Sequence, residues 1–196
     1  MREIRRLCVF CGSSNGANPA YADAARRLGR RLAAERIRLV YGGGNVGLMG
    51  VLADEVLAHG GEVIGVIPHG LAVKEVAHES LTELHVVDSM HTRKAMMEEL
   101  ADGFIALPGG LGTFEEIFEI ITWAQLGIHS KPCGILNAAG YYDKLIEFLD
   151  HAVAERLVRR EHRAMIQIEQ DEGVLLDRMR KYEPPQIEKW IRVEQA

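Results

Sequence analysis

The sequence lacks features that would indicate a membrane protein, a disulfide-rich protein or a nucleic-acid-binding protein. No apolar run approaches the roughly 20 residues that span a bilayer. Only three cysteines are present, which favours a reducing compartment over a disulfide framework. The 23 basic and 28 acidic residues give a net charge of -5, which would not attract a polyanion. We therefore expect a small-molecule ligand, and neither nucleic acid nor a membrane as partner.

The start of the chain also lacks an apolar signal segment followed by a cleavage site with small residues. Residues 1–6 lead directly into a strand-like segment, so we expect a cytoplasmic protein. The chain has 196 residues, of which 47% are hydrophobic, and this is enough to form one core. We predict a single domain over residues 1–196, with a regular core at about 5–182 and a C-terminal tail at 183–196.

Short apolar runs alternate with segments of helical period along the chain. We predict strands at residues 7–11, 38–41, 62–67, 83–87, 103–107, 131–137 and 165–168. We predict the clearest helices at about 19–35, 89–102, 114–126, 141–155 and 172–181. Residues 69–79 show neither period and are predicted to form a loop. This alternation is typical of an α/β fold, a Rossmann-like, doubly wound and mostly parallel sheet flanked by helices on both faces.

Small or glycine-rich loops follow three of the predicted strands, at residues 12–16, 42–47 and 109–113. In a parallel sheet, ligands bind beyond the carboxyl ends of the strands. The second loop matches G-x-G-x-x-G, but the next strand ends in Pro68-His-Gly70, without the acidic residue that holds a ribose in NAD proteins. The match therefore favours close approach of the backbone to a phosphate or to another loop, and does not indicate NAD.

The segment Pro108-Gly-Gly-Leu-Gly-Thr-Phe-Glu-Glu116 joins a predicted strand to a predicted helix. Its glycines and the helix start leave backbone N–H groups available, which predicts a site for an anion such as a phosphate. Glu116 has two interpretations. Thr113 and Glu116 have the spacing of a capping box, which is a structural role. A carboxylate beside a phosphate site is unfavourable unless cations or a substrate require it there, which is typical of a reacting centre, and the chain has such cations at Arg93 and Lys94.

Cys8 and Cys11 match C-x-x-C, which can indicate a redox pair or half of a zinc site. They lie in a predicted strand, where residues three apart point to opposite faces, and the third cysteine, Cys133, is far along the chain. We interpret all three as buried thiols that pack like small apolar residues, and we predict no metal site.

Several motifs together resemble the LONELY GUY family of cytokinin-nucleotide phosphoribohydrolases. They are Cys8-Val-Phe-Cys-Gly-Ser-Ser14, Tyr41-Gly-Gly-Gly44, Val46-Gly-Leu-Met-Gly50, Met90-His-Thr-Arg-Lys94, the segment that ends at Glu116, and Ile121-Thr-Trp-Ala-Gln-Leu-Gly127. The resemblance covers nearly the whole chain. It implies a Rossmann-like homodimer, or a higher even-numbered oligomer, with no cofactor. The implied reaction is hydrolysis of the N-glycosidic bond of cytokinin riboside 5′-monophosphates, and of AMP, to the free base and ribose 5-phosphate.

By position in these motifs, Arg93 and Glu116 match the family's catalytic pair. The implied substrate contacts are Glu75, Arg93, Lys94, Gly110, Leu111, Gly112, Thr113, Phe114, Glu115, Glu116 and Thr122. Around Glu75 the sequence departs from the plant type. One alternative is a nucleotide-binding protein without turnover, although binding alone would not need a carboxylate beside the sugar. The other is a pyridoxal-phosphate-dependent lysine decarboxylase, a label that this family has also carried, but none of the six lysines has a recognisable Schiff-base setting.

Overall fold

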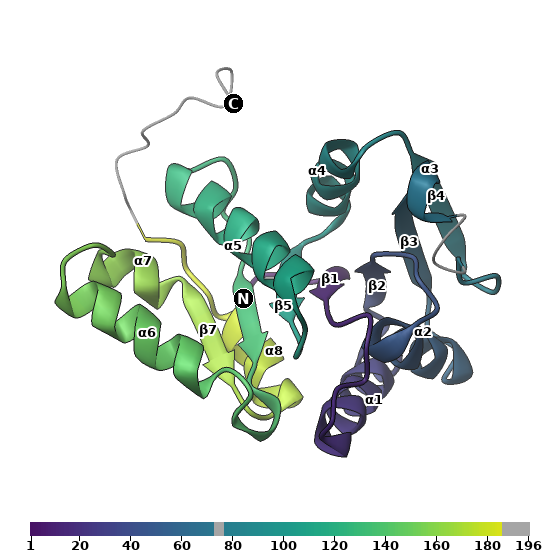
Figure 1. Cartoon of the computed structure of the whole chain (residues 1–196), viewed down its shortest axis with the longest axis horizontal. Helices are drawn as coiled ribbons and strands as arrows, with labels where there is room; N and C mark the ends of the chain where they lie inside the picture. Colours follow the sequence, from purple (N-terminus) through teal and green to yellow (C-terminus); the bar gives the residue numbers. More distant parts are fainter. Residues whose placement is uncertain (73–76, 186–196) are drawn as a thin grey trace.

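The structure is a computed structural model, and it describes residues 1–72 and 77–185 (Figure 1). Its centre is a seven-stranded sheet with the order β4-β3-β2-β1-β5-β6-β7, in which every neighbouring pair is parallel. The strands are β1 (Arg6–Phe10), β2 (Arg38–Tyr41), β3 (Val63–Pro68), β4 (Glu83–Val87), β5 (Gly103–Ala106), β6 (Cys133–Leu136) and β7 (Ile166–Glu169). All seven predicted strands are present, with ends within two residues of the prediction.

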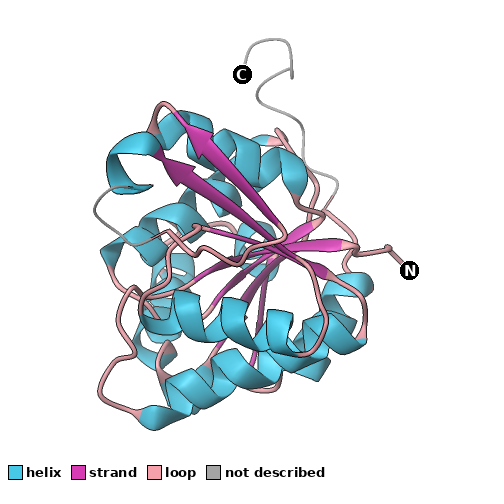
Figure 2. Cartoon of the chain, turned by 90° about the vertical axis from the view of Figure 1, so that its right-hand side faces the viewer, coloured by secondary structure: helices cyan, strands magenta, loops and turns pink. Residues whose placement is uncertain are grey.

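Helices cover both faces of this sheet (Figure 2). They are α1 (Pro19–Ala34), α2 (Gly47–Ala58), α3 (His69–Ala72), α4 (Met90–Leu100), α5 (Leu111–Leu126), α6 (Asp143–Ala154), α7 (Arg160–Ala164) and α8 (Glu172–Arg180), with a 3-10 turn η1 (Ala138–Gly140). One buried cluster joins the sheet to α1, α2 and α8, and the other joins it to α4, α5 and α6. The predicted doubly wound α/β fold is therefore confirmed.

Two short helices were not predicted. The loop prediction for residues 69–79 is wrong at its start, because His69–Ala72 form the single helical turn α3. The five-residue helix α7 was also missed. A segment this short contains too few apolar positions to show a helical period, so periodicity could not reveal either helix. Among the described residues, no helix is long and apolar enough to cross a bilayer.

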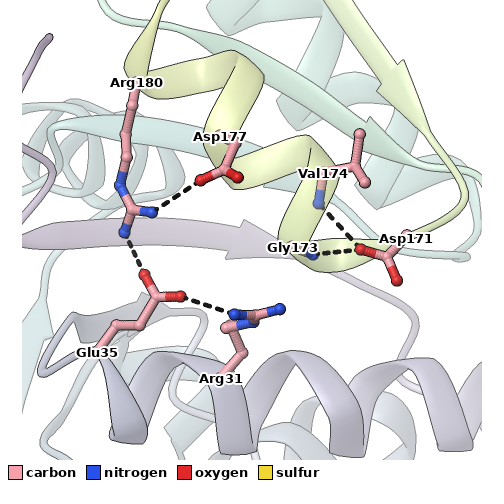
Figure 3. A network of polar contacts seen from close by, with 7 residues as sticks. All are labelled: Arg31, Glu35, Asp171, Gly173, Val174, Asp177 and Arg180. Atoms are coloured by element: carbon pink, nitrogen blue, oxygen red, sulfur yellow. Dashed lines mark hydrogen bonds and ion pairs between the residues drawn. The ribbon is translucent and has the colours of Figure 1, made fainter.

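A network of charged side chains attaches α8 to α1 (Figure 3). Arg180 at the end of α8 is paired with Glu35, which caps the end of α1, and Arg31 Nη1 donates to the same carboxylate at 3.2 Å. Asp171 caps the start of α8 by accepting from the Val174 N–H at 2.9 Å. The Arg180–Glu35 pair thus joins the C-terminal ends of α1 and α8.

Candidate active site

Three loops meet at the carboxyl ends of the central strands. The Gly12 N–H donates to the Pro108 carbonyl at 3.0 Å, and the Leu48 N–H donates to the Gly12 carbonyl at 3.0 Å. The strand order reverses between β1 and β5, and sheets of this kind bind ligands at that switch point. A cavity of about 290 Å³ opens there, between the first and third loops, and its wall includes Tyr21 and Tyr141.

The loop after β5 presents a row of backbone donors. Among the residues that the structure describes, the N–H groups at positions 109–113 have no acceptor, and the Phe114 N–H makes the first bond, to the Gly110 carbonyl at 3.1 Å. Gly110 is the N-cap of α5, so the positive end of the helix dipole lies at the same place. Free N–H groups at a helix start form an anion site. The arrangement supports a phosphate site at the predicted contacts Gly110, Leu111, Gly112 and Thr113.

The capping-box interpretation of Thr113 and Glu116 is wrong. Helix α5 begins at Leu111, and its N-cap Gly110 makes no side-chain hydrogen bond. Thr113 is therefore already inside the helix, and Glu116 lies in its second turn, where neither side chain can cap. The pattern was misleading because threonine is a preferred N-cap, whereas the N-cap of this helix is a glycine three residues earlier, Gly110.

Glu116 is instead paired with Arg93 of α4. Arg93 Nη1 donates to Glu116 Oε1 at 3.0 Å, and both side chains are 11% exposed. Burial raises the pKa of Glu116, and the positive charge of Arg93 opposes that increase. The structure thus brings together the two residues that the family pattern marks as catalytic. A buried carboxylate with a raised pKa and one close cation is typical of a reacting centre.

The guanidinium of Arg93 is held from two further sides. Its Nε donates to the Val66 carbonyl on β3 at 3.0 Å. A Cβ at Gly42 would lie 2.1 Å from Arg93 Nη2, so the guanidinium occupies the space that a side chain at Gly42 would take. At Gly47, which has a φ of +57°, a Cβ would lie 2.3 Å from the Ser13 carbonyl carbon. The predicted close approach to another loop is therefore confirmed at Gly47, whereas at Gly42 the close neighbour is an arginine.

Lys94 is held by two carboxylates. Its Nζ lies 2.5 Å from Glu115 Oε1 and 3.0 Å from Glu119 Oε1. Burial lowers the pKa of Lys94, but the hydrogen bonds to Glu115 and Glu119 outweigh this effect and raise the pKa overall. The sequence analysis did not include Glu119 in the site. Its spacing of four residues from Glu115 places both on one helix face and could have indicated it.

Two further predicted contacts, Phe114 and Thr122, make interactions outside the Arg93–Glu116 pair. Phe114 packs against Tyr142, with 6.1 Å between ring centroids. Thr122 Oγ1 donates to the Phe118 carbonyl of the same helix at 2.7 Å. Thr122 follows Glu116 by six residues, which corresponds to about 9 Å along the helix axis and a different face. Glu75 lies outside the described residues.

The interpretation of the three cysteines as buried thiols is confirmed. All three are buried and free. Cys8 and Cys11 belong to the two different core clusters, on opposite faces of the sheet. Burial raises the pKa of each thiol, that of Cys133 to about 12. Within residues 1–72 and 77–185, no group of three His, Cys, Asp or Glu side chains is arranged to bind a metal ion.

Solved structures with the same fold include two molybdenum-cofactor proteins. A molybdenum cofactor carrier protein from Chlamydomonas reinhardtii superposes with a TM-score of 0.68 at 16% identity, over 91% of this chain and 98% of that one. A molybdenum cofactor binding protein from Rippkaea orientalis gives 0.67 at 21% identity, over 92% and 98%. At these identities the likeness concerns the fold alone.

Sequence comparison identifies much closer relatives. A family model described as "Possible lysine decarboxylase" matches residues 49–179. A protein of Oryza sativa subsp. japonica, named as a probable cytokinin riboside 5′-monophosphate phosphoribohydrolase, is 52% identical over 92% of this chain and 80% of its own length. A cytokinin riboside 5′-monophosphate phosphoribohydrolase of Arabidopsis thaliana is 51% identical over 92% and 85%. The chain therefore belongs to the LONELY GUY family of cytokinin riboside 5′-monophosphate phosphoribohydrolases.

Proposed function

We propose that this chain hydrolyses the N-glycosidic bond of cytokinin riboside 5′-monophosphates, and also of AMP, to give the free base and ribose 5-phosphate. The observation that carries the proposal is the buried pair of Arg93 on α4 and Glu116 on α5, the helix whose start presents free N–H groups. Relatives about 50% identical over most of the chain are named for the cytokinin reaction. Activity on AMP is the further part of the proposal.

In the proposed mechanism, Glu116 acts on the reacting carbon of the ribose. Cleavage of the bond from C1′ to the base nitrogen builds positive charge on the sugar, as in glycoside hydrolysis. The Glu116 carboxylate stabilises this charge, and it either activates the attacking water or attacks C1′ itself. Arg93 keeps the carboxylate ionised and in place, because the guanidinium is a permanently charged donor at 3.0 Å.

The 5′-phosphate binds to the free N–H groups at positions 109–113 in this proposal. Phosphate binding is remote from the bond that breaks, so its energy serves to position C1′ against Glu116. Lys94, which Glu115 and Glu119 hold in place, adds positive charge on the neighbouring turn of α4. The same substrate without its phosphate should therefore be a poor one.

We further propose that the site is completed in a homodimer. Exposed apolar side chains occur on elements around the site, at Leu84 and Val86 on β4, Met90 on α4 and Leu111 at the start of α5. The distance of Thr122 from Glu116 along the helix also supports a contact with substrate held by a second copy.

The single sheet that contains all seven strands supports the assignment of one domain, and the free thiols support a cytoplasmic location.

The proposal is tested by chromatographic assay of the purified protein with isopentenyladenosine 5′-monophosphate, AMP and the two matching nucleosides. We expect free base from both monophosphates and at least about 100-fold less from the nucleosides. Glu116→Gln should lower the rate at least about 100-fold while the protein stays folded. Glu99→Gln is the control, since Glu99 is an exposed carboxylate on α4 and is not one of the predicted contacts. No base from any substrate would reject the proposed hydrolysis.

A further inference from the structure

We propose that Tyr141 is a positioning residue that sets the direction of the N–H groups in the loop after β5. The Tyr141 hydroxyl donates to the Gly109 carbonyl at 2.5 Å, although the two residues are 32 positions apart in the chain. No motif discussed above includes Tyr141. The identity of the ligand, a sugar phosphate, rests on the proposed function, whereas the hydrogen bond itself does not.

Three consecutive carbonyl groups of this loop are each held by a donor from another part of the chain. The Tyr142 hydroxyl donates to Leu107 at 2.7 Å, the Gly12 N–H donates to Pro108 at 3.0 Å, and Tyr141 donates to Gly109. The carbonyls of Pro108 and Gly109, which directly precede the free N–H groups of Gly109 and Gly110, are thus each held by a hydrogen bond. Tyr141 makes the last of these contacts, at the residue before the helix cap.

Because the peptide bond is planar, a contact that holds its carbonyl oxygen also fixes the direction of its N–H group. In a trans peptide the C=O and the following N–H point in opposite directions. A phenol that holds the Gly109 oxygen therefore fixes the direction of the Gly110 N–H, which points away from Tyr141. Side-chain packing cannot supply this orientation, because a Cβ at Gly110 would have no atom within 4 Å. Between two glycines the peptide plane would otherwise rotate readily.

Tyr141 is itself held by its aromatic neighbours. Its ring meets that of Tyr142 edge-on with centroids 4.9 Å apart, and that of Tyr21 edge-on at 5.3 Å. These contacts limit the movement of the phenol ring, so the hydroxyl oxygen is held in position to donate to Gly109. Tyr21 also lines the cavity, but its hydroxyl has no hydrogen-bond partner in the described part of the chain. Tyr21 is therefore a matched control for a phenol in the same wall.

The test compares Tyr141→Phe and Tyr21→Phe with the unaltered protein. Each variant removes one oxygen and keeps the ring. In the protein without ligand, nitrogen-15 relaxation should show that the Gly110 N–H order parameter falls in Tyr141→Phe from about 0.85 toward 0.6. Calorimetric titration with ribose 5-phosphate should show an affinity about 3- to 10-fold weaker, as expected for one neutral hydrogen bond. Tyr21→Phe should leave the Gly110 order parameter near about 0.85, and thermal unfolding should confirm that the variants are folded.

Three results would overturn this role. An unchanged order parameter with weaker ribose 5-phosphate binding would mean that Tyr141 contacts the ligand directly. Unchanged binding, or an equal effect of Tyr21→Phe, would mean that the hydroxyl does not orient the loop. Failure of the proposed hydrolysis is a separate outcome, because it would appear as absence of base release in the unaltered protein. The order parameter is measured without any ligand and would still decide the role of Tyr141.

Discussion

The contact between Gly42 and Arg93 leads to a quantitative prediction for Gly42→Ala. The new Cβ would lie 2.1 Å from Arg93 Nη2, whereas nonbonded atoms of this kind require about 3.5 Å. The guanidinium must therefore move by more than about 1 Å. Its hydrogen bonds to Glu116 and to the Val66 carbonyl are both 3.0 Å long, so such a movement disrupts at least one of them.

The expected cost follows from the kind of bond that is lost. A hydrogen bond to a charged group contributes about 1.5–3 kcal/mol. If the Arg93–Glu116 bond acts in the transition state, kcat/KM should fall about 10- to 150-fold. Displacement of the guanidinium also weakens the charge that most opposes the effect of burial, so the pKa of Glu116 rises further. The reaction needs the carboxylate, so activity falls as the pH drops through this pKa. The acid limb of the kcat/KM profile should therefore move to higher pH in Gly42→Ala.

The assay is base release from the preferred monophosphate, measured as a function of pH for five proteins: the unaltered protein, Gly42→Ala, Gly134→Ala, Arg93→Ala and the double variant Gly42→Ala/Arg93→Ala. Gly134→Ala on β6 is the matched control, since its Cβ would lie 3.1 Å from Met179 Sδ in the core, away from Arg93. It should reduce thermal stability without moving the pH profile. In an Arg93→Ala background, Gly42→Ala should have no further effect, because the guanidinium that the new methyl group would displace is absent. Full activity in Gly42→Ala, or effects that simply add in the double variant, would refute the reasoning.

Two further predictions concern the whole molecule. Sedimentation equilibrium should give twice the 21.8 kDa mass of one chain at micromolar concentration, and a monomer mass there would contradict the dimer. The buried thiols have raised pKa values, so Cys8, Cys11 and Cys133 should react with iodoacetamide at neutral pH at least about 100-fold more slowly in the native protein than in denaturant. Rapid reaction of any one of them in the folded protein would show that it is accessible.

Much of the fold could be predicted from the sequence because its signals are local. Buried strands in a parallel sheet appear as short apolar runs, and all seven runs became strands within two residues of their predicted ends. The error at α5 is also informative. Thr113 has a side-chain oxygen that can cap a helix and Gly110 has no side chain, but the helix starts at Leu111, directly after Gly110. Local preference was overridden there by the path that the strand and the two other loops impose on the backbone.

The sequence by itself determined the alternation of strands and helices, the glycine-rich corner and the identity of the charged residues near it. Each of these depends on residues within a few positions of one another. Only the tertiary structure decided that Arg93 reaches Glu116, that Gly42 makes room for it, and that Tyr141 holds the loop. These contacts join α4 to α5, β2 to α4 and the chain after β6 to the loop after β5. They depend on the strand order of the sheet. Packing of the whole core sets that order, so it cannot be predicted from any short segment of the sequence.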